Sequence, residues 1–291
     1  MGVFHDYGYV NFKSYLTFDE DGNEQWSEPE RYLADYRSIE SKYGICEVGM
    51  FRSPDGKRIM ALARSDKKPN LSVMFYSDDE GKTWSKPEEM QGSLAGERHK
   101  AVYDPISGRL LITFREIVYK DGKLDNNWMA GDWVAWVGTY EDLLEQNEGE
   151  YRILIEEDWA MNAKSGDTGY AGILVLDDGT FIMDSYGHFD EEFSKNAFES
   201  GNYNVRTDLC YIKQAKFKLG EIENENDLID RSALEAKINE VKDTSAEGYT
   251  DTSYAAFAKA LTDAQTVFAD YSAQQIQIDE ALKVLTSAFE G

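Results

Sequence analysis

The sequence predicts a mainly β domain over residues 1–222, followed by a helical domain over residues 223–291. Short alternating or apolar runs, such as GKRIMALAR (56–64) and GRLLITFR (108–115), are separated by turn signals such as SPDG, SDDEG and LDDG. This pattern is typical of antiparallel strands joined by tight turns. In the C-terminal part, the apolar residues recur instead at a 3.6-residue period, which indicates amphipathic helices. The charged segment ENENDLID (223–230) lies between the two patterns, and we expect it to be an exposed linker.

One internal repeat indicates how the strands are grouped. WSEPERY begins at Trp26 and WSKPEEM begins at Trp84, and each follows an acidic, Gly-containing turn. The two tryptophans are on the order of 60 residues apart, which suits one blade of a β-propeller and favours a propeller over a β-sandwich. Further strand-like runs are LSVMFYS (71–77), WVAWVGTY (133–140) and GTFIMDSYG (179–187).

Three apolar stripes predict a C-terminal three-helix bundle. Ser232 and Glu235 have the spacing of a capping box at the start of the first helix. Gly248 separates the first two helices, and residues 270–272 mark the break before the third. The stripes consist of Leu234, Ile238 and Val241; Tyr254, Phe257, Leu261, Ala264 and Phe268; and Ile278, Leu282, Leu285 and Phe289.

Charge and composition exclude several functions. The 291-residue chain carries a formal net charge of −25, which repels phosphate backbones and anionic membranes, so we expect no nucleic-acid partner. An anionic substrate could bind only where basic residues gather locally. No run approaches the roughly 20 apolar residues of a membrane span. The N-terminus lacks the basic start and apolar stretch of a signal peptide and is typical of a strand.

The sequence predicts neither a disulfide framework nor a bound metal or cofactor. Cys46 and Cys210 are the only cysteines, and they are interpreted as buried apolar residues, although a pairing between them stays open. No cluster of His, Cys and carboxylates has the spacing of metal ligands. No glycine-rich loop of the phosphate-binding type is present either.

The segment SDDEGKTW, Ser77 to Trp84, matches the Asp-box pattern S-x-D-x-G-x-T-W at every defined position. The chain therefore resembles sialidases and related propellers that carry BNR (Asp-box) repeats. The residue types suit a structural turn: Asp79 can accept backbone N–H groups, Gly81 can adopt a positive φ, and Trp84 can pack between sheets. In the family this box lies away from the active site, so it predicts the fold and not the catalysis.

Around this box, about residues 5–220 resemble bacterial exo-α-sialidases. In GICEVGMFRSPDGKRIMALARSD, Glu47 and Arg64 have the order and spacing of the family's acid and second arginine. In GDTGYAGILVLDDGTF, Tyr170 takes the place of the family's tyrosine, with Leu174 as its apolar anchor. The resemblance implies retaining hydrolysis of terminal α-linked sialic acid, with sialylated or other acidic glycans as partners.

The chemistry of such a sugar accounts for these residue types. Sialic acid carries a carboxylate on its anomeric carbon, which would repel a carboxylate nucleophile, so a neutral phenol is better suited. A free tyrosine has a pKa near 10 and needs an adjacent base. The resemblance therefore implies Tyr170 as nucleophile, Glu47 as its base and Arg64 as a ligand of the substrate carboxylate through two parallel hydrogen bonds.

The sequence also departs from the family. A third arginine belongs near residues 130–133, where this chain has AGDW, so Arg98 and Arg115 are the alternative substrate-binding candidates. The family's first arginine and its acid/base aspartate come from early blades, and no such segment precedes residue 40. We therefore expect a partial six-bladed sialidase-type propeller of roughly four blades that lacks its N-terminal blades, with weak or no activity in the isolated chain. His99 and His188 are interpreted as structural histidines in preference to pocket residues.

The C-terminal region, about 225–291, resembles the FIVAR module of bacterial cell-surface and secreted glycan-active proteins. The resemblance rests on YTDTSYAAFAKALTDAQTVF and SAQQIQIDEALKVLTSAF. It implies a spacer or a weak glycan contact, a secreted or cell-surface location, and further domains of the same polypeptide. Two alternatives to the sialidase stay open: a non-catalytic glycan-binding or adhesive propeller, and a hydrolase for another sugar.

Overall fold

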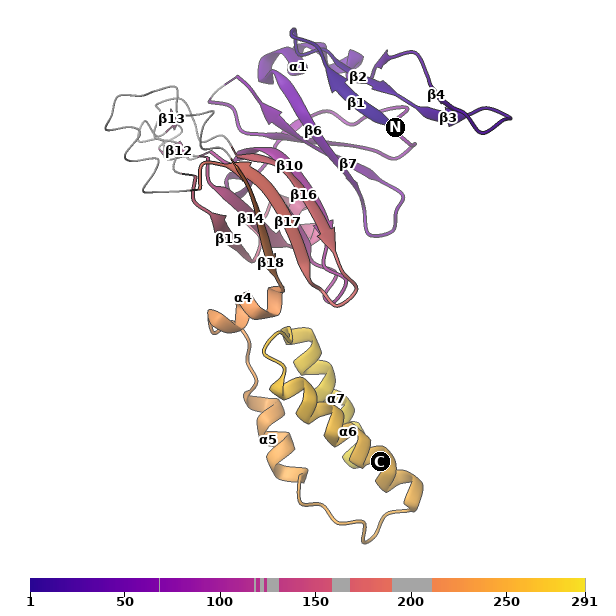
Figure 1. Cartoon of the computed structure of the whole chain (residues 1–291), viewed down its shortest axis with the longest axis vertical. Helices are drawn as coiled ribbons and strands as arrows, with labels where there is room; N and C mark the ends of the chain where they lie inside the picture. Colours follow the sequence, from indigo (N-terminus) through magenta and orange to yellow (C-terminus); the bar gives the residue numbers. More distant parts are fainter. Residues whose placement is uncertain are drawn as a thin grey trace. The chain divides into compact units, whose positions relative to one another are not determined.

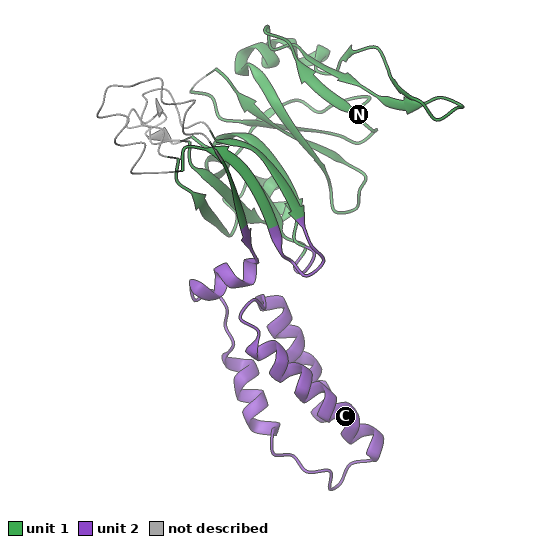
Figure 2. Cartoon of the chain, in the orientation of Figure 1, with its two compact units in different colours: residues 1–104, 108–174, 182–215 green, residues 105–107, 175–181, 216–291 purple. Residues whose placement is uncertain are grey.

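The computed structural model describes residues 1–67, 69–117, 119–120, 123–124, 131–158, 168–189 and 211–290. Cys210 and Ala130 lie outside these ranges, so the expectations that concern them are not addressed by the structure. The chain divides into two compact units (Figure 2). The first comprises residues 1–104, 108–174 and 182–215, and the second comprises residues 105–107, 175–181 and 216–291.

The described residues form mainly antiparallel sheets, together with six α-helices (Figure 1). Two of the sheets are four-stranded meanders. The first contains β6 (Ile45–Arg52), β7 (Ile59–Ser65), β8 (Val73–Ser77) and β9 (Glu88–Glu89), and the second contains β10 (Gly96–Tyr103), β11 (Leu110–Glu116), β14 (Trp133–Gly138) and β15 (Tyr151–Glu156). The predicted strands at 56–64, 71–77, 108–115 and 133–140 are thus confirmed. The last of these ends at Gly138, because Thr139 caps the helix α2 (Tyr140–Glu145) in a capping box with Asp142.

Strand β7 explains how the two meanders are held together. All residues from Ile59 to Ala63 are buried, because alternate side chains enter two different cores. Met60 and Leu62 pack in a cluster with Ile112 and Phe114 of β11. Ile59, Ala61 and Ala63 pack in a second cluster on the other face, with Phe75 and Trp84. The first meander is therefore covered on both faces, as expected for a sheet between neighbouring sheets.

Each meander has a β-bulge in its first strand. The register between β6 and β7 shifts between Cys46 and Gly49, and the register between β10 and β11 shifts between Glu97 and Lys100. Glu47 and Arg98, the first residues inside these bulges, have φ values of +49° and +64°. Bulges of this kind re-aim side chains at the end of a strand.

The N-terminal segment adds two small sheets. One contains β1 (Gly2–His5), β2 (Asn11–Ser14) and β5 (Glu30–Arg31), and the other is the hairpin of β3 (Leu16–Phe18) and β4 (Glu24–Trp26). The short helices η1 (Ala34–Tyr36) and α1 (Arg37–Tyr43) follow. Glu40 of α1 is fully buried and accepts hydrogen bonds from the backbone N–H and the side-chain amide of Asn11, so it anchors β2 to α1.

The remaining strands follow the second meander. β16 (Gly169–Val175), β17 (Phe181–Gly187) and β18 (Tyr211–Phe217) form a three-stranded sheet, which confirms the strand predicted within 179–187. β12 (Tyr119–Lys120) and β13 (Lys123–Leu124) form a short pair. The described part of the chain contains no closed propeller, so the six-bladed architecture stays a prediction.

The Asp-box has the structural role that its residues predict. Asp79 accepts hydrogen bonds from the backbone N–H and the hydroxyl of Thr83, which lower the pKa of its carboxyl to about 2. Gly81 has a φ of +78°, and its N–H donates to Ser77 Oγ at 2.8 Å. Trp84 is buried against Phe75 and Tyr32.

The two copies of the sequence repeat, at Trp26 and at Trp84, have only part of their structure in common. Ser85 bonds Tyr76 through its backbone N–H and its Oγ, and Ser27 bonds Tyr15 in the same way. Trp84 is 7% exposed, whereas Trp26 is 57% exposed. The turn chemistry therefore repeats, but the packing of the tryptophan does not.

The second unit contains the C-terminal helices α4 (Leu219–Glu225), α5 (Ser232–Val241), α6 (Asp251–Ala269) and α7 (Gln275–Glu290). The last three share one apolar core built from the three predicted stripes, and Gly248 between α5 and α6 has a φ of +92°. Their assignment to a FIVAR module stays a prediction. Among the described helices, none is both long and apolar enough to cross a bilayer.

Two expectations for this region were wrong. The segment 223–230 is not a fully exposed linker, because its first residues belong to α4 and Glu223 is buried. The predicted boundary at 222/223 consequently falls inside α4. Ser232 does not cap α5: the N-cap is Arg231, and the side chain of Asp230 accepts from the backbone N–H of Ser232. The capping box lies instead at the start of α6, between Thr250 and Ser253.

Candidate active site

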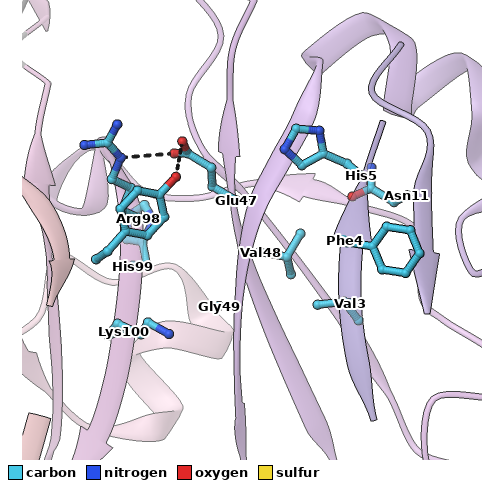
Figure 3. Close-up of a pocket in the computed structure, with 11 residues that line it drawn as sticks. Val3, Phe4, His5, Asn11, Glu47, Val48, Gly49, Arg98, His99 and Lys100 are labelled. Atoms are coloured by element: carbon cyan, nitrogen blue, oxygen red, sulfur yellow. Dashed lines mark hydrogen bonds and ion pairs between the residues drawn. The ribbon is translucent and has the colours of Figure 1, made fainter. Parts of the chain in front are cut away.

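Glu47, Arg64, Arg98 and Tyr170 come together at the ends of four strands. Glu47 lies on β6, Arg64 on β7, Arg98 on β10 and Tyr170 on β16. The phenol of Tyr170 donates to Glu47 Oε1 at 2.6 Å, across 123 positions of sequence. Arg64 Nη1 donates to the same oxygen at 3.1 Å, and Arg98 Nε lies 3.5 Å from Glu47 Oε2. The phenol of Tyr170 and two of the three predicted guanidinium groups thus surround the carboxylate of Glu47. Figure 3 shows Glu47 with Arg98 beside it.

The backbone at these positions is in a strained region. Tyr170 has a φ of +52°, so it shares the left-handed conformation of Glu47 and Arg98. Non-glycine residues seldom adopt this region, and such strain concentrates at functional sites. Gly169 has a φ of +132°, and a Cβ there would lie 2.5 Å from Arg98 Cδ. A glycine is therefore required beside Tyr170 for Arg98 to pack against this strand.

Tyr170 and Glu47 form a directly hydrogen-bonded phenol–carboxylate pair. Burial and the hydrogen bond to Glu47 raise the pKa of the Tyr170 phenol to about 12, because both disfavour a phenolate beside a carboxylate. The phenol is therefore protonated at neutral pH. Its ring remains about half exposed and accessible to a ligand. Any attack by Tyr170 must transfer the proton to Glu47 as the new bond forms.

Arg64 is surrounded by carboxylates. Its Nη1 binds Glu47, its Nη2 donates to Asp66 Oδ1 at 2.6 Å, and its Nε lies 3.1 Å from Glu97 Oε1. Burial lowers the pKa of Arg64, but the charges of Glu97 and Glu47 outweigh burial and raise it overall. Arg64 therefore stays charged and orients Glu47.

Arg115 occupies a deeper position than the pocket. Its guanidinium is 6% exposed and pairs with the carboxylate of Glu97, which is 3% exposed. Glu97 thus bridges Arg64 and Arg115 in the interior, beneath the surface at which Tyr170 is exposed. Arg115 therefore supports Glu97 and does not line the pocket, so it is not placed for the direct contact with a substrate that was expected from the sequence.

Arg98 contacts Tyr170 and its neighbours. Its guanidinium lies over the Tyr170 ring, 4.6 Å from the centroid. Its Nη1 donates to Tyr186 Oη at 2.7 Å and to the carbonyl of Thr168 at 2.8 Å. The positive charge of Arg98 lowers the pKa of Tyr170 and so opposes the effects of burial and Glu47.

A pocket of about 160 Å³ opens beside this group. Glu47, Arg98 and Tyr170 form one part of its lining, and Arg64 lies behind Glu47 outside the lining. Strand β1 and the residues beside the bulges complete it. These further lining residues are Val3, Phe4, His5, Asn11, Val48, Gly49, His99 and Lys100.

The other candidates have structural surroundings. His99 belongs to the pocket lining, but it is only 1% exposed: its Nε2 lies 3.0 Å from the carbonyl of Leu94, and its ring stacks on Phe114. His188 is buried beside Asp158. Leu174 is 56% exposed, so the expected apolar anchor was wrong. The described part of the chain contains no group of three or more His, Cys, Asp or Glu side chains that could hold a metal ion.

The AGDW segment places an acid where the resemblance implies an arginine. Burial raises the pKa of Asp132 to about 6, and the charges of Glu116, Glu157 and Asp158 contribute. The backbone N–H of Asp158 donates to its Oδ1 at 2.9 Å. Asp132 thus belongs to an acidic group outside the pocket lining.

Asp66, Glu97 and Tyr9 also belong to this group of side chains, although none of them was predicted from the sequence. Asp66 directly follows β7 and accepts hydrogen bonds from Arg64 and from the phenol of Tyr9. Glu97 precedes Arg98 in the segment GERHK, where strand alternation alone would place the two side chains on opposite faces. The sequence does carry one signal for Glu97. Glu97 precedes Arg115 at nearly the same spacing at which Glu47 precedes Arg64.

A scan against protein-family models gives no match for this chain, and a search of the curated proteins gives none either. Among solved structures, a protein of unknown function from Dyadobacter fermentans is 19% identical, with a TM-score of 0.43, covering 62% of this chain and 42% of that chain. A leech intramolecular trans-sialidase complexed with 2,7-anhydro-Neu5Ac is 15% identical, with a TM-score of 0.37, covering 71% of this chain and 27% of that chain.

A Trypanosoma rangeli sialidase in complex with sialic acid is 16% identical, with a TM-score of 0.33, covering 62% of this chain and 26% of that chain. This chain therefore spans less than half the length of each of these three proteins. TM-scores of this size mark a partial superposition and assign no function to the chain.

Proposed function

We propose that this chain carries the nucleophile and base of a retaining glycoside hydrolase that acts on terminal α-linked sialic acid or a related acidic sugar. The hydrogen bond from Tyr170 to Glu47 carries this proposal. A phenol bonded to a carboxylate beside an open pocket can attack an anomeric carbon while the carboxylate accepts its proton.

The proposed reaction has two steps. In the first, Tyr170 Oη attacks the anomeric carbon, its proton passes to Glu47, and the aglycone departs with the electron pair of the glycosidic bond. In the second, water attacks the tyrosyl glycoside, the phenolate that leaves recovers the proton from Glu47, and the proton that the water loses balances the one taken up by the departed aglycone. Two inversions give net retention of configuration.

The basic residues support an anionic substrate. Arg64 and Arg98 bring two positive charges to the single carboxylate of Glu47. Arg98 reaches the pocket directly, whereas Arg64 acts from behind Glu47. The charge of Arg98 over the Tyr170 ring also favours the phenolate as it leaves in the second step.

A second candidate is a glycan-binding propeller without catalysis. Two observations favour it: all three arms of Arg64 are engaged by Glu47, Asp66 and Glu97, and the AGDW segment supplies Asp132 where a third arginine is implied. A binding protein needs the pocket but not the proton transfer. The Tyr170→Phe variant separates the two, because a binding protein keeps its glycan affinity and an enzyme loses turnover.

The test uses the whole chain with a fluorogenic sialoside and a 3-fluorosialosyl fluoride. Because the isolated chain is expected to have weak activity at most, we expect slow turnover with retention, and a covalent sugar adduct on Tyr170 in the intact mass and in the tryptic peptide. Tyr170→Phe should lower turnover at least about 10³-fold. Tyr103→Phe is the matched control, because it removes a phenol that bonds the carbonyl of Arg52 outside the pocket.

An adduct on another residue, or full activity of Tyr170→Phe, would contradict the assignment of the nucleophile. A panel of aryl glycosides in the same assay tests a hydrolase for another sugar. If both the wild type and Tyr170→Phe bind the glycan and neither turns it over, the chain is a glycan-binding protein without catalysis.

A further inference from the structure

The side of the pocket away from Arg98 is built by the turn between β1 and β2. Asp6 Oδ1 accepts the backbone N–H groups of Gly8 and Val10, which closes this turn. His5, the last residue of β1, lines the pocket. Figure 3 shows Arg98 and His5 on opposite sides of Glu47. His5 and Arg98 thus line the pocket on either side of Glu47.

Contacts on two sides hold the imidazole of His5. Its Nδ1 lies 2.9 Å from the backbone carbonyl of Asp6. A carbonyl can only accept, so Nδ1 carries the hydrogen and Nε2 is left to exchange a proton with a ligand. The ring also stacks on Tyr9, with centroids 6.2 Å apart and planes within 14°.

Tyr9 connects His5 to the reacting pair. Its phenol donates to Asp66, and Asp66 accepts from Arg64, which in turn binds Glu47. The hydrogen bond to Asp66 raises the pKa of Tyr9 to about 12, so Tyr9 remains a donor at neutral pH. This chain of contacts fixes the turn relative to Glu47 although the two are far apart in sequence.

The other titratable residues of the described lining are already engaged or unsuited to giving up a proton. Glu47 and Tyr170 are hydrogen-bonded to each other, Arg98 packs on Tyr170, and the ring of His99 is buried against Phe114. Lys100 offers an ammonium, and a lysine ammonium is a weak acid at neutral pH. Imidazole is the side chain whose ordinary pKa lies nearest to neutral pH.

We propose that His5 is the general acid of this site, an inference that rests on the proposed function. In the first step, Nε2–H gives its proton to the glycosidic oxygen as the bond to the anomeric carbon breaks. The electron pair of that bond stays on the oxygen, and the aglycone leaves as a neutral alcohol. In the second step, neutral His5 takes a proton from the attacking water, which restores the imidazolium.

The charged groups around His5 come from several elements. Within the turn, the backbone carbonyl of Asp6 and the titratable phenol ring of Tyr9 contact His5, the Asp6 carboxylate is bound by the turn's own N–H groups, and Lys67 lies over the Tyr9 ring. Glu47, Arg98 and Lys100 line the same pocket from β6 and β10. In this proposal, His5 takes the role that the family resemblance implies for an aspartate.

The experiment compares leaving groups within one variant. A general acid is needed for an alcohol leaving group and hardly at all for an acidic phenol. We expect His5→Gln and His5→Ala to lower kcat/KM for sialyllactose by about 10²- to 10⁴-fold. The same variants should hydrolyse a 4-methylumbelliferyl sialoside within about tenfold of the wild-type rate, because the first step then needs no proton. The ratio of the two rates is independent of the folded fraction of each preparation.

Tyr7→Phe is the matched control, because Tyr7 lies in the same turn with a fully exposed side chain. It should leave both rates unchanged. Equal losses on both substrates in the His5 variants would overturn this inference and leave the proposed function intact. A wild-type chain that hydrolyses neither substrate would overturn the proposed function and the inference together.

Discussion

The two four-stranded meanders share a bulge in their first strand but carry opposite charges at the first residue inside that bulge. Each begins with a bulged strand, and the first residue inside the bulge is Glu47 in one meander and Arg98 in the other. The residue just before the bulge faces an arginine on the neighbouring strand: Cys46 pairs with Arg64, and Glu97 pairs with Arg115. The same kind of bulge thus presents a carboxylate, the proposed base, in the first meander and a guanidinium in the second.

The difference between Cys46 and Glu97 determines how the two arginines are used. Cys46 is a buried neutral thiol, and burial raises its pKa to about 12, so it supplies no charge to Arg64. Arg64 instead pairs with Glu47 inside the bulge of β6, with Asp66 directly after β7, and with Glu97 of the second meander. Glu97 neutralises Arg115 within its own meander. The site therefore depends on ion pairs between the two meanders: Arg64 with Glu97, and Arg98 with Glu47.

The largest expected effect concerns the residue inside the first bulge. Glu47→Gln keeps the shape of the side chain but removes the base, so turnover of an aryl sialoside should fall about 10³-fold, or about 4 kcal/mol in the barrier. Glu80→Gln is the control, because Glu80 pairs with Arg52 at the Asp-box turn, outside the pocket lining. A Glu47→Gln chain with unchanged kcat would contradict the proton transfer.

Removing the charge before the second bulge should mainly affect folding. Glu97→Ala leaves Arg115 and one arm of Arg64 buried without their partner, so the free energy of unfolding in urea should fall by about 3–5 kcal/mol. Cys46→Ala, at the equivalent position of the first meander, should cost about 1 kcal/mol. Equal losses in the two variants would mean that Glu97 contributes packing alone.

A smaller effect is expected for the residue inside the second bulge. Arg98→Lys keeps the charge but loses the planar stack on Tyr170 and the paired contacts to Tyr186 and Thr168. Turnover should fall about 10- to 100-fold, with kcat changing more than KM, because the loss concerns the reacting phenol. A rise in KM with constant kcat would instead identify Arg98 as a ligand of the substrate carboxylate.

The smallest effect concerns alkaline stability. Folding raises the pKa of Tyr170 from its ordinary value near 10 to about 12, so between these values the unfolded chain releases this proton first. The stability that Tyr170 contributes is complete below about pH 10 and is lost as the pH rises toward 12. Urea titrations at about pH 9 and pH 11 should show a smaller loss for Tyr170→Phe than for the wild type. An equal loss would mean that the phenol titrates normally.

The strands and the helical stripes followed from the sequence because they depend on local periodicity. Ile59–Ser65 and Leu110–Glu116 contain the apolar runs that predict them, and the Asp-box turn of Ser77–Trp84 is determined by side chains within eight residues. The burial of Trp84 and the exposure of Trp26 could not be predicted in this way, since the same turn precedes both. Whether a sheet lies beside the tryptophan is a property of distant segments.

The sequence by itself determined the candidate residues Glu47, Arg64 and Tyr170, because their order and spacing resemble a known arrangement. Only the tertiary structure decided how they meet. Bulges at Glu47 and Arg98 turn these side chains toward Tyr170, and Glu97 fixes Arg64 from the neighbouring sheet. His5 and Tyr9 join the site through a turn that is distant in sequence. Such contacts depend on register shifts and sheet packing, which side-chain periodicity does not encode.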